Sequence, residues 1–344
     1  MNILVTIPVE APEVERLKAI APNAAFRFKG ASRMRNEAGL IGGQPFADLV
    51  DEGPLTPEDG AWANVILGNA ELSLLAQAKS LQWLQTNSAG VGEYTAPGVL
   101  PQGVLLTNAT GAYGLAISEH MLACLLSLMK KLPQYRDAQK QGAWASQGAV
   151  RSLFDARVLV LGMGDIGGEF GKRCHALGAH VVGVRRSDLS VPDYAEAVYP
   201  LEKLDALLPD ADVVAIALPG TPQTKGLFDE KRIALMKAGS YLLNVGRGSI
   251  VDTEALCDAL ERGRLSGAAL DVTDPEPLPP EHRLWRIENA IVTPHISGFY
   301  HLRETYLRIL QICEENLRRY LAGEPLINQV DFETGYRKSN SQQP

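Results

Sequence analysis

Three polar residues lie in short segments that follow apolar runs in the second half of the chain. LLNVGRGSIVD places Arg247 between two glycines, AALDVTDPEPL places Glu276 in a proline-rich loop, and AIVTPHISG places His295 after a proline. A guanidinium can hold a carboxylate and polarise a carbonyl. An imidazole can donate a proton to a developing alkoxide, and a carboxylate can orient that imidazole. Because ligands of open α/β sheets bind where strands end, these three residues are the predicted catalytic group.

A glycine turn follows another apolar run, in VLVLGMGDIGGEFGKRCHALG. In the spacing G-x-G-x-x-G, Gly162 allows a tight turn, Gly164 lets the backbone approach a pyrophosphate, and Gly167 lets a helix pack on the strand. A glycine-rich turn without a ligand is the alternative. A strand, turn, helix and second strand at the expected spacing favour a dinucleotide. The residues predicted to contact it here are Gly162, Met163, Gly164, Asp165, Ile166 and Gly167.

The next apolar run ends in VVGVRRSDL, with Arg185 and Arg186 side by side and Ser187 after them. The end of this strand, about 20 residues past the glycines, faces the adenosine ribose, where a carboxylate selects NAD. Two guanidinium groups and a hydroxyl suit a 2′-phosphate instead. The sequence therefore predicts a preference for NADP, with NAD as the other cofactor to consider. A solvated pair of surface arginines with loose cofactor selectivity is the alternative, and the nearby Asp188 weighs slightly against a preference for NADP.

A nicotinamide dinucleotide beside a cation, an acid and an imidazole suits reduction of a 2-keto acid. Arg247 would hold the substrate carboxylate, His295 would donate the proton, and Glu276 would orient the imidazole ring. We therefore expect an oxidoreductase that reduces a 2-keto acid to the 2-hydroxy acid.

The composition predicts a two-domain protein, since 344 residues exceed most single cores. The net charge of -7 excludes a broad nucleic-acid surface, because phosphates require a basic field. No apolar stretch reaches the ~18 residues that a membrane span needs. The four cysteines are scattered, without metal-like spacing. We expect a cytoplasmic protein with a small-molecule partner and with no metal, membrane or nucleic-acid partner.

Apolar runs alternate with amphipathic stretches along nearly the whole chain, which predicts stacked βα units. We expect an α/β protein with two doubly wound parallel sheets, Rossmann-like or flavodoxin-like, and an active-site cleft between them. The substrate domain is predicted to comprise residues 1–112 and 297–332, with the NAD(P)-binding domain, residues 113–296, inserted in the chain. Residues 333–344 are predicted to form a disordered tail. The predicted strands are NILVTI, AFRF, NVILG, LQWLQT and VLLTN in the first half, and RVLVLG, HVVGVR, DVVAIALP, SYLLNVG, SGAALDVT and AIVTPHIS in the second.

Local patterns between these strands give further expectations. One long helix is predicted from Ser118 to Gln141. His120, near its start, is expected to have a structural or capping role. Trp144 lies in the connector that follows, where packing is favoured over a role in a neighbouring subunit's active site. Residues 39–60 are rich in glycine, proline and acidic residues, which predicts a loop.

The chain resembles the D-isomer-specific 2-hydroxyacid dehydrogenase family, including its glyoxylate/hydroxypyruvate reductases, over nearly its whole length. LGMGDIGGEFGKRCHALGAHVVG is similar to the family's dinucleotide turn, LPGTPQTKGLFDEKRIALMKAGSYLLNVGRGSIVD to its central signature, and ALDVTDPEPLPPEHRLWRIENAIVTPHISG to its last. The resemblance implies a D-2-hydroxy acid product, catalysis by Arg247, Glu276 and His295, and a place beside the nicotinamide for Asp271. It also implies cofactor contacts from Leu218, Pro219, Thr224, Val245, Gly246, Ser297 and Gly298.

The resemblance extends to the first half of the chain. It implies that the loop NSAGVG, residues 87–92, binds the substrate carboxylate through Ala89, Gly90 and Val91, with backbone N–H groups of the last two as donors. It also implies that TNATGAYGLAISEHMLACLL leads into a helix that helps form a homodimer. Two features depart from the family pattern. Many relatives carry an aspartate where Gly92 stands, and FYHLRETY after TPHISG is bulkier than the small residues common there.

Two other functions stay open at this stage. One is an NAD-linked dehydrogenase of the same family, such as an enzyme of the phosphoglycerate type, which extra basic residues near the substrate loops would favour. The other is a cofactor-sensing, corepressor-like binding protein without turnover. The presence of Arg247, Glu276 and His295 counts against the second, although relatives of that kind can keep these residues.

Overall fold

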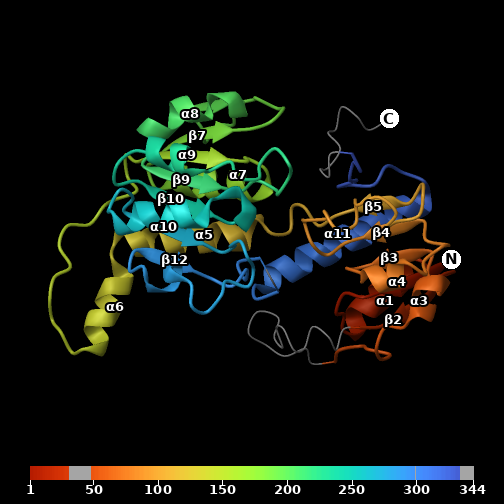
Figure 1. Ribbon diagram of the computed structural model, residues 1–344. Coiled ribbons are helices and arrows are strands. Elements are labelled where there is room, and N and C mark those ends of the chain that lie inside the picture. Colours follow the sequence, from red (N-terminus) through yellow and green to blue (C-terminus); the bar gives the residue numbers. More distant parts are fainter. Residues whose placement is uncertain (31–47, 299, 334–344) are drawn as a thin grey trace. The chain divides into compact units, whose positions relative to one another are not determined.

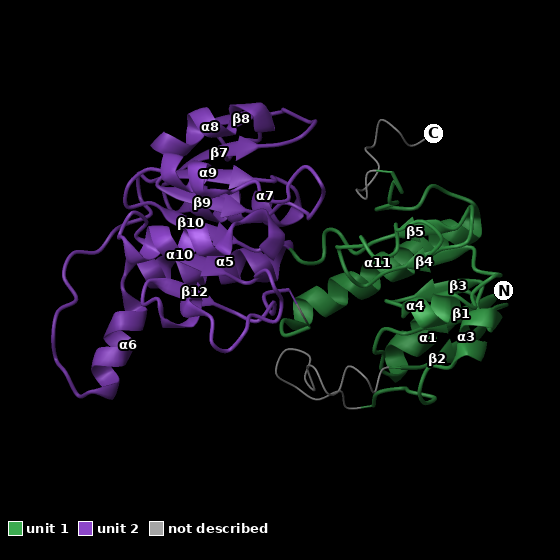
Figure 2. Ribbon diagram, viewed as in Figure 1, with its two compact units in different colours: residues 1–113, 299–344 green, residues 114–298 purple. Residues whose placement is uncertain are grey.

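The computed structural model describes residues 1–30, 48–298 and 300–333. The chain divides into two compact units, which Figure 2 colours separately. Unit 1 comprises residues 1–113 and 299–344, and unit 2 comprises residues 114–298. Each unit contains one parallel sheet, so the predicted α/β class with two doubly wound sheets is confirmed.

Unit 1 is built on five parallel strands in the order β2-β1-β3-β4-β5, the flavodoxin-like order. Successive side chains of β1 enter two different cores, since side chains alternate along a strand. Ile3 packs with α1 and α11 on one face, whereas Leu4 packs with α4 on the other. The strands are β1 (Asn2–Val5), β2 (Ala25–Phe28), β3 (Val65–Leu67), β4 (Trp83–Gln85) and β5 (Leu105–Thr107).

The described helices of unit 1 are α1 (Ala11–Ile20), α3 (Pro57–Trp62), α4 (Leu72–Leu75) and α11 (Arg303–Ala322), and Figure 1 shows α11 running along the sheet. The loop predicted for residues 39–60 is wrong at its end, where α3 forms. Thr56 and Asp59 make a capping box, and Pro57 occupies the first helical position, where its missing N–H costs nothing. Residues 39–47, and all but Glu333 of the predicted tail, lie outside the described residues.

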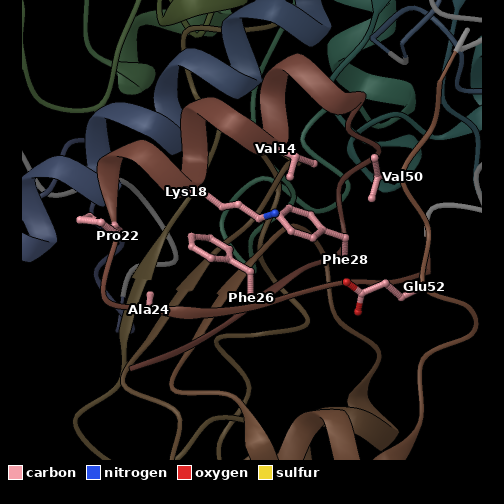
Figure 3. A pocket seen from close by; sticks show the side chains of 9 residues that line it. Val14, Lys18, Pro22, Ala24, Phe26, Phe28, Val50 and Glu52 are labelled. Atoms are coloured by element: carbon pink, nitrogen blue, oxygen red, sulfur yellow. The ribbon is translucent and has the colours of Figure 1, made fainter.

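A pocket of about 300 Å³ lies between α1 and the outer strand β2. In Figure 3, Lys18 extends from α1 toward the rings of Phe26 and Phe28, whose centroids are 5.7 Å apart. Its lining contains none of the predicted site residues.

Helix α11 is anchored by a fully buried amide, that of Asn316. Its Nδ2 donates to Gln85 Oε1 at 2.8 Å and to the Ile327 carbonyl at 3.0 Å, and its Oδ1 accepts from the Ile327 N–H at 2.8 Å. One side chain therefore ties the helix to β4 and to the segment that follows the helix.

Unit 2 is built on seven parallel strands in the order β12-β11-β10-β9-β6-β7-β8. The chain begins in the middle at β6, moves outward to β8, and then returns to β9 on the other side of β6. This reversal is the topological switch point at which dinucleotides bind in such sheets. The strands are β6 (Arg157–Leu161), β7 (His180–Val184), β8 (Ala197–Tyr199), β9 (Val213–Ile216), β10 (Tyr241–Asn244), β11 (Gly267–Leu270) and β12 (Ala290–Val292).

Helices flank this sheet (Figure 1). None of the helices within residues 1–30, 48–298 and 300–333 is both long and apolar enough to cross a membrane. The α-helices of unit 2 are α5 (Gly114–Met129), α6 (Leu132–Lys140), α7 (Asp165–Ala176), α8 (Leu204–Leu207), α9 (Glu230–Leu235) and α10 (Thr253–Glu261), and its 3₁₀ turns are η1 (Leu201–Lys203), η2 (Leu208–Asp210), η3 (Gly248–Ile250) and η4 (Arg283–Arg286).

The single helix predicted from Ser118 to Gln141 is wrong. The structure has two helices, α5 and α6, because Lys131 adopts a left-handed conformation with φ of 57°. Pro133 stands in the first turn of α6, a position it tolerates, and cannot continue a helix from before it. No residue of α6 is buried, and Figure 1 shows α6 and the following loop projecting from the rest of unit 2.

Replacing Asn316 should destabilise unit 1 selectively. In Asn316→Ala the Ile327 N–H loses a buried partner, so we expect a loss of about 2 kcal/mol, seen in a thermal scan as a drop of roughly 5 °C. Glu315→Ala is the matched control on the same helix. Its carboxylate makes only partly exposed ion pairs with Arg318 and Arg319, so it should change stability by less than about 0.5 kcal/mol. Equal melting temperatures for the two variants would contradict this anchoring role.

Candidate functional site

The glycine turn lies between β6 and α7, beside the switch point. Gly162 has φ of +88°, and a Cβ there would lie 2.6 Å from the Ala217 carbonyl oxygen. A Cβ on Gly167 would lie 2.1 Å from the Gly162 carbonyl oxygen. Only glycine fits either position, because the helix and the neighbouring loop approach the turn so closely.

Gly164 stands in a different environment. A Cβ there would meet no atom within 4 Å, and the residue is exposed immediately before the first residue of α7. Within the described parts of the chain, no group accepts a hydrogen bond from the amides of Gly164 and Ile166. Donors at a helix N-terminus beside open space form a site for an anion. The predicted residues of the turn therefore fit a pyrophosphate.

Two side chains of the turn, those of Met163 and Asp165, contact neighbouring elements. A Cβ on Gly183 of β7 would lie 1.7 Å from Met163 Sδ, so Met163 packs directly on that strand. Asp165 Oδ2 accepts from the Gly114 N–H at 2.9 Å, which ties the start of α7 to the start of α5. The turn is thus held from two sides.

Arg185, at the end of β7, lies against the glycine turn. Its Nη2 donates to the Met163 carbonyl at 2.7 Å, and its Nη1 lies 3.4 Å from Asp188 Oδ2. Arg186 and Ser187 are exposed next to it. Hydrogen bonds from the Ser190 hydroxyl and amide, with the charge of Arg185, lower the pKa of Asp188. The strand end therefore carries two cations and a hydroxyl, together with one anion that contacts Arg185.

The carboxylate of Asp271 organises the loop after β12. The residue is only 3% exposed. Its Oδ1 accepts from Thr293 Oγ1 at 2.6 Å and from the Ile296 N–H at 3.0 Å. Its Oδ2 accepts from the N–H and the hydroxyl of Ser297 at 3.1 and 2.5 Å. Three residues of one loop are thus fixed around a single buried anion.

His295 lies inside this loop. Its N–H donates to the Asp271 carbonyl at 2.8 Å, and its φ of 52° places it in the left-handed region. Its Nδ1 lies 2.6 Å from Glu276 Oε1. Since the carboxylate oxygen can only accept, Nδ1 carries the proton in this contact, and Nε2 is left for other chemistry. Both side chains are partly exposed.

Arg247 follows β10 in a turn that the neighbouring loops hold closely. A Cβ on Gly246 would lie 2.3 Å from the Leu218 carbonyl, and one on Gly248 would lie 1.9 Å from the Thr273 carbonyl. The exposed guanidinium donates to the Gly246 carbonyl at 2.7 Å. The structure therefore brings the turn of Arg247 into backbone contact with the segment that leads to Glu276.

The other predicted cofactor residues also follow strands of this sheet. Val245 donates its N–H to the Ile216 carbonyl at 3.1 Å, and Thr224 Oγ1 donates to the Pro219 carbonyl at 2.7 Å. Residues 218–224 follow β9, and Gly298 closes the turn after Ser297. No three His, Cys, Asp or Glu side chains within the described ranges are grouped so that they could hold a metal ion.

The predicted substrate residues Ala89, Gly90 and Val91 lie in unit 1, after β4. Asn108 Nδ2 donates to the Ala89 carbonyl at 2.9 Å, and Ser88 Oγ donates to the Gly90 carbonyl at 2.8 Å. Among the residues that the structure describes, none accepts from the amides of Gly90 and Val91. The loop thus has fixed carbonyls and two unused donors.

Sequence reasoning gave no role to Thr293 and expected a structural or capping role for His120. His120 lies within α5, past its first turn, so it does not cap the helix. Its Nε2 lies 3.2 Å from Thr293 Oγ1. The position of Thr293, a hydroxyl residue two places before His295, was the signal that could have identified it. The contact with His120 depends on tertiary packing and has no such signal.

Substitutions at two glycines should separate folding from dinucleotide binding. Gly164→Ala should leave stability within about 0.5 kcal/mol, yet weaken dinucleotide binding by roughly tenfold or more, because a methyl group enters the anion site. Gly167→Ala should cost about 1–3 kcal/mol of stability, because the turn itself must shift. Thermal scans and fluorescence titration with NADPH measure both effects. Full affinity in Gly164→Ala would place the pyrophosphate elsewhere.

Residues 122–297 match the family described as D-isomer specific 2-hydroxyacid dehydrogenase, NAD binding domain. The chain is 31% identical over 266 residues to glyoxylate/hydroxypyruvate reductase B of Erwinia tasmaniensis, covering 75% of this chain and 81% of that protein. It is 30% identical over 264 residues to D-3-phosphoglycerate dehydrogenase of Archaeoglobus fulgidus, covering 76% of this chain and 49% of that protein, so it spans about half of that relative.

A solved structure supports the same assignment. The D-isomer specific 2-hydroxyacid dehydrogenase from Xanthobacter autotrophicus, in complex with NADPH and MES, superposes with a TM-score of 0.77 at 28% identity, covering 97% of this chain and 99% of that one. Together with two parallel-sheet units and the matched NAD-binding domain, these similarities show that the chain belongs to the D-isomer-specific 2-hydroxyacid dehydrogenase family of NAD(P)-dependent oxidoreductases.

Proposed function

We propose that this protein is an NADP-preferring reductase that converts a small 2-keto acid of the glyoxylate or hydroxypyruvate type into the D-2-hydroxy acid. The observation that carries the proposal is the contact of 2.6 Å between His295 Nδ1 and Glu276, in a loop fixed by Asp271. This contact presents an imidazole with one nitrogen occupied and the other available for a proton transfer. A reductase of this substrate type is among the relatives by name.

Each of the three catalytic side chains has its own role. His295 donates a proton from Nε2 to the oxygen of the substrate carbonyl, and Glu276 keeps the ring oriented through Nδ1. Arg247 binds the substrate carboxylate and polarises the carbonyl, because its guanidinium presents parallel donors. The reduced nicotinamide, when bound, supplies the hydride. The amides of Gly90 and Val91 bind the substrate carboxylate, which their lack of an acceptor among the described residues supports.

The preference for NADP rests on the end of β7. Arg185 lies against the glycine turn through its contact with the Met163 carbonyl, which keeps one cation beside the ribose position. Arg186 and Ser187 add a second cation and a hydroxyl. A guanidinium recognises phosphate by paired charge-assisted hydrogen bonds. The similar dehydrogenase from Xanthobacter autotrophicus was solved with NADPH bound, which agrees with this choice.

A homodimer is the assembly that we propose. Leu132, Trp144, Val150 and Phe154 are large apolar residues, exposed at 54%, 104%, 49% and 73% respectively, on α6 and the connector after it. Large exposed apolar side chains on and near a projecting segment favour a protein interface.

Sedimentation velocity tests the assembly. The protein should sediment as a dimer, and a double change, Leu132→Asp with Trp144→Ser, should shift it toward monomer because the apolar contact is lost. Leu235→Asp, at another exposed leucine of unit 2, is the control and should leave the dimer intact. A wild-type monomer at micromolar concentration would contradict the proposal.

Removing either principal catalytic side chain should abolish most turnover. His295→Ala and Arg247→Ala should each lower kcat/KM by about 100-fold or more, because proton donation or carboxylate binding is lost. Both variants should still bind NADPH in a fluorescence titration. Near-normal rates in either variant would remove the role assigned to that residue.

Cofactor preference is tested by initial rates with glyoxylate, hydroxypyruvate, pyruvate and phenylpyruvate, each with NADPH and with NADH. We expect faster turnover with NADPH and with the smaller acids. Changing Arg185→Asp and Arg186→Ala together should weaken NADPH by about 100-fold, through loss of two charged hydrogen bonds. It should weaken NADH less, by what the glycine turn loses with the donor to the Met163 carbonyl.

Arg262→Ala is the control for that double change, since this exposed arginine pairs with Asp258, four residues before it. Equal loss of NADPH and NADH would show that the arginines do not select the 2′-phosphate. A preference for NADH with a phosphorylated hydroxy acid would favour the phosphoglycerate-type alternative. Binding of NADPH without turnover of any 2-keto acid would favour the corepressor-like alternative.

A further inference from the structure

A second layer of polar contacts lies behind the Asp271 loop, on helix α5. His120 Nε2 lies 3.2 Å from Thr293 Oγ1, and Thr293 Oγ1 lies 2.6 Å from Asp271 Oδ1. All three residues belong to unit 2. The contacts therefore form a chain from helix α5 to the buried carboxylate of Asp271. Its middle member, Thr293, stands two residues before His295.

The direction of these hydrogen bonds follows from the groups themselves. A carboxylate oxygen that takes a further bond from the Ile296 N–H acts only as an acceptor, so the single hydroxyl proton of Thr293 points to Asp271. The hydroxyl oxygen then has only lone pairs to offer His120. His120 must therefore donate, which requires its proton on Nε2.

A second neighbour of the His120 ring, Cys124, is consistent with this assignment. Cys124 Sγ lies 3.5 Å from His120 Nε2, one helical turn along α5. Burial raises the pKa of the Cys124 thiol to about 11, so the sulfur stays protonated and is a weak acceptor. It competes little with Thr293 for the Nε2 proton.

We propose that His120 is a positioning residue for the reaction: by donating from Nε2 to Thr293, it fixes the hydroxyl that orients Asp271 and so sets the place of His295. Without the hydrogen bond from His120, Thr293 is still bound to the end of β11, through the Leu270 carbonyl and the Asp271 carboxylate. The hydrogen bond from His120 also ties the loop after β12 to α5, which packs along β10, β11 and β12. The inference rests on the proposed function for the reaction, but its hydrogen bonds stand independently.

Four variants test this role. His120→Leu should lower kcat roughly 10- to 100-fold, with cofactor affinity unchanged, because a shift of about 1 Å in a catalytic group costs that much. His120→Gln should restore most of kcat, since its amide N–H reaches a position close to Nε2. Thr293→Val should lose at least as much as His120→Leu. Adding His120→Leu to Thr293→Val should cost nothing further, because His120 acts only through that hydroxyl.

Glu119→Ala is the control, since Glu119 is exposed on the same helix and pairs with Arg173 at 3.8 Å. It should keep the wild-type kcat. Three outcomes would each overturn the proposal: wild-type kcat in His120→Leu, no recovery in His120→Gln, or a full additional loss in the double variant. A lower melting temperature with unchanged kcat would assign His120 to folding alone.

An observation that does not depend on turnover separates this proposal from the proposed function. Nitrogen-15 chemical shifts of the His295 ring should move in His120→Leu and return in His120→Gln. If the wild-type protein reduces no 2-keto acid, the proposed function fails, and these shifts then decide the positioning role. Ring signals of His295 that are identical in all three proteins would overturn it.

Discussion

A buried carboxylate needs hydrogen-bond donors, and the order of the loop after β12 follows from the donors that Asp271 has. A buried charge without partners would cost several kcal/mol. Its carboxylate accepts from the side chain of Thr293, the backbone of Ile296, and both the backbone and side chain of Ser297. The loop cannot move away from β11 without leaving that charge unpaired. His295 lies between Thr293 and Ile296, so the hydrogen bonds of Asp271 set its position.

The parallel sheet lets this arrangement form from short segments of sequence. Since every strand of unit 2 runs in the same direction, each β-to-α loop starts at the same edge. Short segments after β6, β7, β10, β11 and β12 therefore converge without any long excursion of the chain. The glycines close the remaining gaps, because Gly246 and Gly248 allow backbone contacts with Leu218 and Thr273 that a side chain would block.

The sequence was sufficient for those features whose cause is local. Strand periodicity predicted both sheets, and the glycine spacing predicted the turn, because a Cβ at Gly162 or Gly167 would collide with nearby backbone. Features that arise from tertiary packing could not be predicted from the sequence. The break at Lys131 replaced one expected helix with two, since apolar periodicity continues across a residue whose backbone has turned. Strand β8 has only three residues and one buried side chain, Val198, too few for a detectable pattern.

The candidate site divides in the same way. Arg247, Glu276 and His295 were predicted from their places after strands, and their roles stay proposals that the contact of 2.6 Å supports. The hydrogen bond from His120 to Thr293 joins residues 173 positions apart. Only the way α5 packs on the sheet brings them together, and one sequence carries no signal of that packing.

The hydrogen bond from Arg185 to the Met163 carbonyl has a consequence for protein engineering. The side chain assigned to the adenosine end of the cofactor is also a support for the turn assigned to its phosphates. Under the proposed function, cofactor choice and phosphate binding are therefore mechanically linked. A designer who exchanges Arg185 for an acidic residue removes a donor from a backbone carbonyl and introduces a group that can only accept. Converting the enzyme cleanly to the other nicotinamide would require a second substitution that supplies the missing donor to Met163.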